Sequence, residues 1–353
     1  MNEFTLTLLK WFREYGRDLP WRQTTDPYAI WLSEIILQQT QVKQGWAYWE
    51  RFMQRWPQVD LLAEATEDEV LREWQGLGYY SRARNLHFAA KQIVEMGGFP
   101  TTLEGIKSLK GVGDYTAAAI GSFAFGLPAA VVDGNVYRVL SRHFGISTPI
   151  NSTEGKKEFA LLAQELLPTS DHFSLFSCSF LRPSGSKRPS AERPHAPCSI
   201  YNQAIMDFGA IQCTPSSPNC SNCPLIESCI AFREGRVNEL PVKLKTLKVK
   251  ERRLTYVYLR YQGETVIHRR GEGDIWQGLY EPWLVDVVPF GAILLRQNVK
   301  HVLTHRILWA DFYLWEPAER PQLPAGYFWI KEAELDNYAK PRLIEILLDF
   351  VTS

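Results

Sequence analysis

A glycine-rich turn followed by a carboxylate, in the stretch Leu109–Asp133, constrains the fold of this chain more than any other feature. The turn Leu109-Lys110-Gly111-Val112-Gly113 lies between two segments with helical patterns, and glycine allows the positive φ that a tight turn needs. The backbone N–H groups of Gly111, Val112 and Gly113 can then point outward at the N-terminus of the next helix, where one phosphate binds. An ordinary glycine turn between helices is the alternative interpretation.

Two carboxylates, Glu34 and Asp133, have sequence surroundings that suit acid–base chemistry. Asp26 as N-cap and Pro27 at the first helical position predict the start of a helix, in which Glu34 lies on a mostly apolar face. Burial there raises the pKa of a carboxyl, which can then act as a general acid, whereas a Glu at the edge of the face is solvated. Asp133 before Gly134 predicts a helix N-cap or a turn, and capping would also hold a catalytic carboxylate in place.

Four of the six cysteines fall in one loop with the spacing C-x6-C-x2-C-x5-C: Cys213, Cys220, Cys223 and Cys229. Thiolates clustered in a proline-rich loop with little apolar sequence need a soft metal centre to hold the loop together. Zinc is one alternative, although zinc ribbons usually contain two C-x2-C pairs. Disulfides are the weaker alternative, because Met1–Tyr15 does not have the pattern of a secretory signal. We therefore expect a cytoplasmic protein, and no apolar run predicts a membrane span.

Composition favours a globular chain with more than one core, since 45% of its 353 residues are hydrophobic and 12 are Trp. The 39 basic and 39 acidic side chains cancel, so the chain lacks the basic excess that is usual in nucleic-acid-binding domains. A protein that searches duplex DNA needs only a basic face, and Arg82 with Arg84 and Arg138 with Arg142 offer local basic groups. The basic run 243–253 predicts a solvated linker.

The turn at Leu109–Gly113, the segment Gly126-Leu127-Pro128 and the following Asp133 together resemble the helix-hairpin-helix DNA glycosylases. In that superfamily, the residue two places after the last glycine of the hairpin distinguishes two chemistries. Lyase members carry a Lys that forms a Schiff base there, and this chain has Tyr115. The resemblance therefore implies a monofunctional glycosylase, with a bifunctional endonuclease III type glycosylase/lyase as the alternative.

Further segments resemble the adenine DNA glycosylases of the MutY family: SEIILQQTQV at 33–42, LPWR at 19–22 and YNQAIMDFG at 201–209. The resemblance implies that Glu34 protonates adenine and that Asp133 is the nucleophile or stabiliser of an oxocarbenium-like sugar, as in two-carboxylate glycoside hydrolysis. It places Tyr115 close to the sugar. It also identifies the cysteine spacing with a structural [4Fe-4S] loop.

The same resemblance implies that the adenine leaves the duplex to reach its pocket. The residues expected to hold the extruded base are Trp21, Arg22 and Gln203. The residues expected to fill or wedge the opposite strand are Gln38, Gln39, Gln41 and Tyr79.

Beyond residue 250 the pattern becomes alternating and β-rich. The expected strands are Leu254–Tyr261, Thr265–Arg270, Val299–Thr304 and Ile307–Trp315, and the expected helices are Val288–Arg296 and Lys340–Val351. The segment Ile275–Glu281 resembles the Nudix-like domain of the adenine glycosylases, without the acidic box that binds magnesium. Where the family often has Phe-Ser-His at a lesion-reading tip, this chain has Leu303-Thr304-His305. The resemblance implies that Thr304 and His305 read 8-oxoguanine, and an exposed hairpin with an incidental His is the alternative.

The sequence thus predicts a multidomain chain with an all-α helix-hairpin-helix glycosylase domain and a [4Fe-4S] loop at 1–232, a linker at 233–250, and an α+β Nudix-like domain at 251–353. A Ser-, Pro- and Arg-rich insert at about 171–199 matches nothing in the family pattern. The expected partner is double-stranded DNA with adenine opposite 8-oxoguanine or guanine, bound by a monomer, and replication or repair partners follow only by family analogy. A non-catalytic iron–sulfur DNA-binding sensor is the alternative from another functional class.

Overall fold

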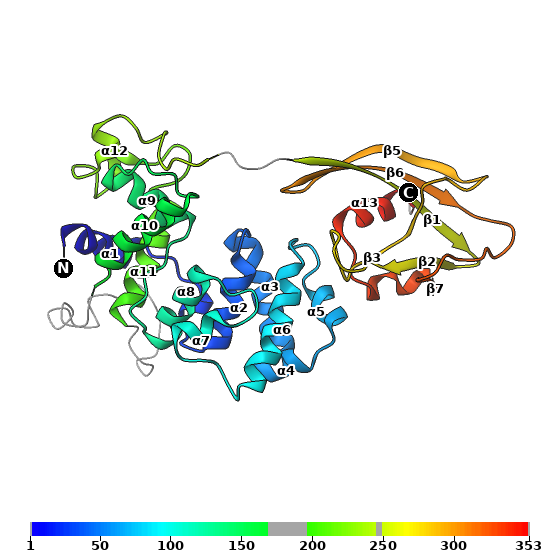
Figure 1. Cartoon of the computed structure of the whole chain (residues 1–353), viewed down its shortest axis with the longest axis horizontal. Helices are drawn as coiled ribbons and strands as arrows, with labels where there is room; N and C mark the ends of the chain where they lie inside the picture. The colour runs from blue at the N-terminus through cyan, green and yellow to red at the C-terminus, as the bar shows by residue number, and fades with distance from the viewer. Residues whose placement is uncertain (1, 169–195, 245–248, 352–353) are drawn as a thin grey trace. The chain divides into compact units, whose positions relative to one another are not determined.

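A computed structural model describes residues 2–168, 196–244 and 249–351 (Figure 1). These residues form two compact units, one of residues 1–39 with 91–245 and the other of residues 40–90 with 246–353. This division cuts through the helical region, whereas the sequence predicts one boundary at 233–250, so the predicted domain limits remain a prediction. Within the described ranges, no helix is long and apolar enough to cross a membrane.

The first unit is helical, and its core lies between α1, α8, α9, α10 and α11 (Figure 1). Its elements are α1 (Glu3–Tyr15), the 3-10 turn η1 (Pro20–Arg22), α2 (Pro27–Leu37), α7 (Leu103–Lys107), α8 (Asp114–Phe125), α9 (Gly134–Phe144), α10 (Thr153–Leu166), α11 (Pro197–Asp207), the π-helical turn η4 (Phe208–Gln212), η5 (Cys220–Asn222) and α12 (Ile230–Arg233). The core side chains Leu8, Phe159 and Tyr201 are almost completely buried. Helix α6 (Ser81–Glu95) runs from one unit into the other.

Local signals set the ends of the helices that carry the predicted carboxylates. The Asp26 carboxylate accepts hydrogen bonds from the backbone N–H groups of Tyr28 at 3.0 Å and Ala29 at 3.3 Å, with Pro27 at the first position of α2. Helix α9 ends at Gly145, whose φ is 67°. The helix starts and ends are therefore those expected from cap residues.

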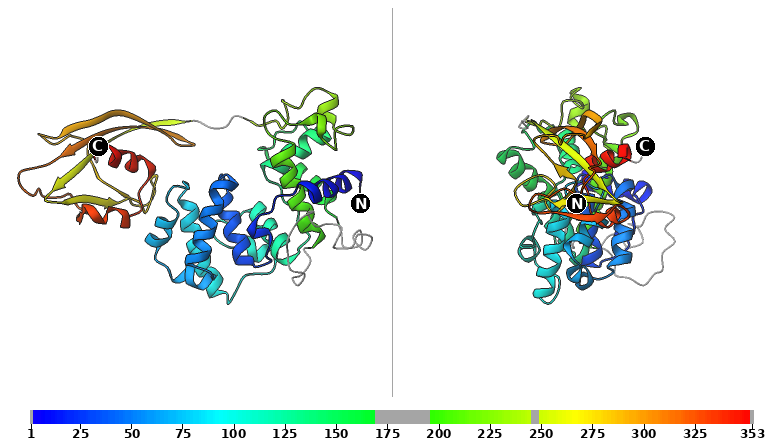
Figure 2. Two further views of the ribbon diagram at one scale, coloured as in Figure 1. Left: turned by 180° about the vertical axis from the view of Figure 1, so that it is seen from behind. Right: turned by 90° about the vertical axis from the view of Figure 1, so that its right-hand side faces the viewer.

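The second unit combines helices with a sheet. Its helices are α3 (Val42–Arg55), α4 (Val59–Glu64), α5 (Glu67–Glu73), part of α6 and α13 (Arg342–Val351), with the 3-10 turn η6 (Glu332–Asn337). Its strands are β1 (Lys250–Tyr261), β2 (Glu264–Arg269), β3 (Tyr280–Glu281), β4 (Trp283–Leu284), β5 (Ile293–Val302), β6 (Arg306–Trp315) and β7 (Tyr327–Lys331). The sheet order is β3-β2-β1-β6-β5, with β4 paired to β1 and β7 paired to β2, and β1 and β6 are parallel. Figure 2 shows α13 beside the long strands, where Leu343 and Leu347 pack against Tyr256 and Phe312.

The predicted helix at Val288–Arg296 is wrong. Pro289 and Gly291 form a turn, with φ of 83° at Gly291 and a hydrogen bond from the Ala292 N–H to the Pro289 carbonyl oxygen. The chain then enters β5, which pairs with β6. A turn and strand pairing therefore override the apolar pattern, whereas the predicted helix near the C-terminus is present as α13.

The predicted insert lies almost entirely outside the described residues. Residues 196–199 are described, and they belong to the start of α11 and not to an insert, which corrects the predicted limit at 199. Pro197 occupies the first turn of this helix, and the buried Cys198 thiol lies 3.3 Å from the Leu127 carbonyl oxygen. The start of α11 is therefore fixed against the segment that follows α8.

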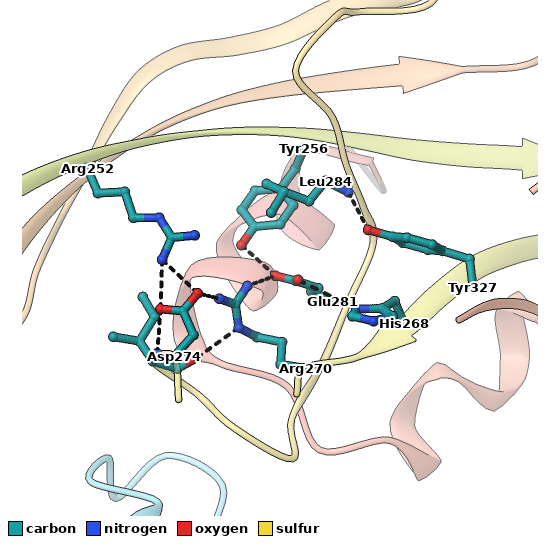
Figure 3. A network of polar contacts seen from close by, with 9 residues as sticks. Arg252, Tyr256, His268, Arg270, Asp274, Glu281, Leu284 and Tyr327 are labelled. Carbon is teal, nitrogen blue, oxygen red and sulfur yellow. Dashed lines mark hydrogen bonds and ion pairs between the residues drawn. The ribbon is translucent and has the colours of Figure 1, made fainter. Parts of the chain in front are cut away.

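A buried polar network joins β1, β2 and β3 in the second unit (Figure 3). Arg270 forms an ion pair with Glu281 and donates to Asp274 at 2.5 Å, and Tyr256 donates to Glu281 at 2.8 Å. Arg252 donates to both oxygens of Asp274 at 2.7 Å. Because Arg270 and Glu281 are almost fully buried, each charge needs the other. The network holds the segment 270–281, which includes the Nudix-like motif.

Candidate active site

Glu34 lies in the middle of α2 and is 7% exposed. Its Oε2 accepts a hydrogen bond of 2.7 Å from the hydroxyl of Tyr115, the second residue of α8. Burial raises the pKa of Glu34 to about 7, and the Tyr115 hydrogen bond and the Arg22 charge only partly oppose this rise. A carboxyl with this pKa keeps its proton near neutral pH and can donate it to a base or leaving group.

Asp133 is the N-cap of α9. Its Oδ1 accepts hydrogen bonds from the backbone N–H groups of Asn135 at 2.9 Å and Val136 at 2.8 Å, and its Oδ2 accepts from the Asn135 amide at 2.7 Å. Burial raises the pKa of Asp133, and these hydrogen bonds act against that rise because they favour the carboxylate. The charges of Asp133 and Glu34 are close enough to affect one another. The structure thus brings Glu34, Tyr115 and Asp133 together.

Arg22, predicted to contact the base, is held by a carboxylate that the sequence patterns do not reveal. Its Nη1 donates to Asp207 Oδ2 and its Nη2 to Asp207 Oδ1, both at 2.8 Å. Trp21, beside it in η1, is buried. Asp207 ends α11, and it is part of the YNQAIMDFG segment, so membership of that segment was the available signal.

Gln203 also lies on α11 and is 6% exposed. Its amide donates to the Ser199 hydroxyl at 3.2 Å. Across residues 2–168, 196–244 and 249–351, no hydrogen bond joins Gln203 to Glu34, Tyr115 or Asp133. The structure therefore places Gln203 in the same helical unit as the carboxylates without a direct bond to them.

The predicted wedge glutamines occupy the end of α2 and the start of α3. The Gln38 amide donates to the Thr116 hydroxyl at 3.2 Å, which ties the end of α2 to α8. Gln39 is exposed and has φ of 58°, a conformation that is uncommon for residues other than glycine. Gln41 is exposed at the N-cap of α3. The turn presents Gln39 and Gln41 to solvent and keeps Gln38 against the protein.

The glycine turn joins α7 to α8. Gly111 has φ of 81°, whereas Gly113 is extended and immediately precedes α8, so only Gly111 uses the left-handed region. Both glycines are exposed, whereas Val112 between them is buried. The Val112 N–H donates to the Leu109 carbonyl oxygen at 3.1 Å, so the prediction that this N–H group points outward is wrong. A Cβ at Gly113 would meet no atom within 4 Å, so the space before the α8 N-terminus is open to an anion.

The four predicted metal ligands lie on the loop between η4 and α12, where their charges affect one another. Burial raises the pKa of Cys223 to about 11, so this thiol becomes a thiolate near neutral pH only with help from a metal. In the described part of the chain, no three His, Cys, Asp or Glu side chains are close enough to hold a metal ion. Four thiols on one loop are a donor set that fits a thiolate-bound iron–sulfur cluster.

Two buried arginines of α9 bind this cysteine loop. Arg138 Nε donates to the Cys213 carbonyl oxygen at 2.7 Å. Arg142 Nη1 donates to the Thr214 carbonyl oxygen at 2.7 Å and lies 3.4 Å from Cys213 Sγ, and its Nη2 donates to the Pro215 carbonyl oxygen at 3.1 Å. The arginines are 8% and 3% exposed. The prediction that they form a basic surface patch is wrong, because they satisfy carbonyl groups of the loop.

The other predicted basic pair also contacts protein groups. Arg84 Nη1 donates to the Gln277 carbonyl oxygen at 2.6 Å, and the Arg82 guanidinium lies over the rings of Trp74 and Tyr79. Burial lowers the pKa of Arg82 to about 10. This pair therefore fixes the second unit internally.

The predicted lesion-reading tip is the turn between β5 and β6. Thr304 and His305 are exposed, and the Thr304 hydroxyl is hydrogen-bonded to the hydroxyl of Tyr79, which is itself 46% exposed. Tyr79 has φ of 47°. Leu303 packs against the core of the sheet, so it does not stand at the tip in place of an aromatic ring. The structure thus brings together Tyr79, predicted to wedge the opposite strand, and Thr304, predicted to read 8-oxoguanine.

Comparisons with known proteins match both parts of the chain. Residues 32–168 match the HhH-GPD superfamily of base excision DNA repair proteins, and residues 255–350 match the NUDIX domain. The adenine DNA glycosylase of Buchnera aphidicola subsp. Schizaphis graminum is 33% identical over 280 residues, 78% of this chain and 73% of that protein. That of Homo sapiens is 41% identical over 251 residues, 68% of this chain and 41% of that protein. A solved thermostable thymine-DNA glycosylase matches with a TM-score of 0.55 and 29% identity, covering 65% of this chain and 95% of its own.

The burial of Glu34 predicts a pH-dependent gain in stability for Glu34→Gln. Between pH 4.5 and about 7 the unfolded chain loses the Glu34 proton while the folded chain keeps it, so the wild type loses stability as the pH rises. Gln cannot ionise. Urea unfolding measures the free energy of unfolding of Glu34→Gln minus that of the wild type. This difference should be more favourable to the variant at pH 8 than at pH 4.5, by up to about 3 kcal/mol.

Glu95→Gln is the matched control, because Glu95 is exposed. Its substitution should change the unfolding free energy by less than about 0.5 kcal/mol at either pH. An equal effect of Glu34→Gln at both pH values would contradict the buried, protonated state of Glu34.

Proposed function

Because this chain belongs to the adenine DNA glycosylases, which are base excision DNA repair enzymes, we propose that it hydrolyses the N-glycosidic bond of adenine paired with 8-oxoguanine or guanine. The observation that carries the proposal is the buried Glu34, hydrogen-bonded to Tyr115 and close to Asp133. All three groups come from one chain, which supports action as a monomer. The proposed setting is the cytoplasm, on the DNA of the nucleoid.

In the proposed reaction, Glu34 donates its proton to the extruded adenine, which makes the base a better leaving group. Positive charge then develops on the sugar, and Asp133 stabilises it or adds to it before water completes the hydrolysis. Asp133 suits this role because three hydrogen bonds favour its carboxylate form. Tyr115 holds the Glu34 carboxyl in place. Trp21, Arg22 and Gln203 are proposed to contact the base, while Gln38, Gln39 and Gln41 approach the opposite strand.

Double-stranded DNA is the partner that the family implies, and the turn at Gly111–Gly113 is proposed to bind its backbone. Support comes from the two exposed glycines and the open space before α8. Tyr115 lies two residues after Gly113 on the same helix. A phosphate held at the turn would therefore lie at a fixed distance from the Tyr115–Glu34 pair.

Base release under single-turnover conditions tests the proposed function. The duplex carries one adenine opposite 8-oxoguanine, and duplexes with adenine opposite guanine and thymine opposite guanine serve for comparison. We expect adenine release, strand breaks only after alkali, and a rate that falls as the pH rises above about 7, where Glu34 loses its proton. Glu34→Gln should lower the rate about a hundredfold or more while DNA binding persists.

The same assay separates the alternatives. Thymine release would indicate the activity named for the solved thymine-DNA glycosylase. Strand breaks without alkali, with an adduct trapped by borohydride, would indicate an endonuclease III type lyase, which the hydroxyl of Tyr115 disfavours because it cannot form a Schiff base. DNA binding by Glu34→Gln together with no base release by the wild type would support the non-catalytic DNA-binding sensor.

A [4Fe-4S] cluster is the proposed cofactor, held by Cys213, Cys220, Cys223 and Cys229. When bound, the cluster supplies a structural cross-link of the loop. The support is a set of four thiols on one loop, fastened to α9 by Arg138 and Arg142. Because α9 begins at Asp133, the loop also supports the helix that positions this carboxylate.

Cys220→Ser tests the cofactor. We expect loss of iron and of the broad visible absorption of the cluster, with a lower Tm, because one of four ligands is gone. The matched control is Ser221→Ala, next to it on the same loop. A cluster-free protein with the wild-type Tm and full base release would contradict the structural role.

The tip Thr304-His305 with Tyr79 is proposed to read 8-oxoguanine opposite the adenine. Tyr79 and Thr304, whose hydroxyls are hydrogen-bonded to one another, are both exposed residues, and they offer polar groups and an aromatic ring at one place. The sheet beneath supports this tip, since β5 and β6 flank it. The proposed domain division, with a lesion-recognition domain at 251–353, rests on this assignment.

Thr304→Ala should reduce the preference for adenine opposite 8-oxoguanine over adenine opposite guanine by about threefold to tenfold, the value of one lost hydrogen bond. The ratio of the two single-turnover rates at low enzyme concentration measures this preference. Thr153→Ala, an exposed Thr at the start of α10, is the control. An unchanged ratio in Thr304→Ala would remove Thr304 from lesion recognition.

A further inference from the structure

A buried carboxylate, Asp207, joins two guanidinium groups beside the proposed active site. Its side chain has no exposed surface. It accepts hydrogen bonds from the backbone N–H of Arg17 at 2.9 Å, from Arg17 Nε at 2.9 Å and from Arg17 Nη2 at 2.5 Å. Arg22 adds two more bonds of 2.8 Å in a two-pronged pair. The cluster Arg17–Asp207–Arg22 therefore fixes the direction of the Arg22 guanidinium.

The charges of this cluster are unequal, with two guanidinium groups and one carboxylate. Tyr115 of α8 is hydrogen-bonded to Glu34, and the charges of Asp133 at the start of α9 and of Arg22 in η1 act on the pKa of Glu34. Arg22 is the cation among them, and a cation near a carboxyl favours loss of its proton. Asp207 lies against Arg22 and weakens its field at Glu34, since the two charges form a pair.

A buried ion pair by itself adds little net stability to a fold. Removing charges from water costs about as much as their attraction returns, so an apolar pair of similar size would stabilise the fold as well or better. The cluster Arg17–Asp207–Arg22 instead suits the proposed active site, where the Arg22 guanidinium has one orientation and part of its charge is cancelled. The Arg22 charge lowers the pKa of Glu34, whereas a general acid must keep its proton.

We propose that Asp207 is a positioning residue of the active site, which holds the Arg22 guanidinium in its orientation and cancels enough of its charge for Glu34 to remain protonated. The inference rests on the proposed function, because it takes Glu34 as the general acid. Asp207 acts through Arg22 and does not contact the reacting atoms. It therefore controls the pH range of the reaction.

The pH profile of the single-turnover rate, with enzyme in excess over a duplex carrying adenine opposite 8-oxoguanine, tests this role. In Asp207→Asn the Arg22 charge is no longer cancelled, so the high-pH limb of the profile should move down by about one pH unit. The rate should then be about tenfold below the wild type at pH 8 and within about twofold of it at pH 5.5. Arg17→Gln removes the other guanidinium and should move the limb to higher pH.

Asp18→Asn is the matched control, since it makes the same change at an exposed carboxylate on the segment that carries Arg17 and Arg22, where water screens the charge. Its limb should coincide with that of the wild type. Arg17→Gln decides the question if Asp207→Asn does not fold, because the Arg17 side chain is 28% exposed and the Asp207–Arg22 pair remains.

If the high-pH limb of the rate profile stays at the wild-type pH in folded Asp207→Asn and Arg17→Gln, the inference is overturned and the proposed function is not. A rate that falls equally at every pH would likewise indicate a structural role only. A wild-type protein that releases no adenine from any of the duplexes would overturn the proposed function, and with it this role of Asp207.

Discussion

The contact between the middle of α2 and the first turn of α8 is the constraint on which the site depends. Glu34 is buried there, and its carboxyl accepts a hydrogen bond from the Tyr115 hydroxyl. Gln38 repeats the connection one turn later through Thr116. Because α8 starts directly after Gly113, the exposed turn and Tyr115, the donor to the buried acid, lie within two residues of one another. A movement of the turn would therefore reach Glu34 through Tyr115.

Helix α9 makes a second connection of the same kind. Its N-cap is Asp133, and Arg138 and Arg142 one and two turns later bind carbonyl groups of the cysteine loop. The loop thus acts on the proposed chemistry through the position of a helix, at a distance from the reacting atoms. The two buried arginines therefore support the helix that begins after Asp133.

Sequence patterns predict the parts of this site that depend on local chemistry. Asp26 with Pro27 marks the start of α2, and the alternating pattern after residue 250 marks most long strands, because caps and strand periods are written in neighbouring residues. Sequence patterns do not predict features that depend on contacts between residues far apart in the chain. In the sequence Arg142 resembles a surface cation, because its contact with the cysteine loop is not local. The role of Asp207 likewise depends on Arg17 and Arg22, which lie far from it in the sequence. The wrong helix at Val288–Arg296 has the same cause, since pairing with β6 is not local.

The anchoring of α11 at its two ends determines the register of this helix. The Cys198 thiol lies against the Gly126 and Leu127 carbonyl oxygens at the start of the helix, and Asp207 binds Arg17 and Arg22 at its end. The helix is thus positioned at both ends by contacts between described residues. A shift of α11 along its axis would break the contacts at both ends together, so these contacts fix the register of Gln203 and Asp207.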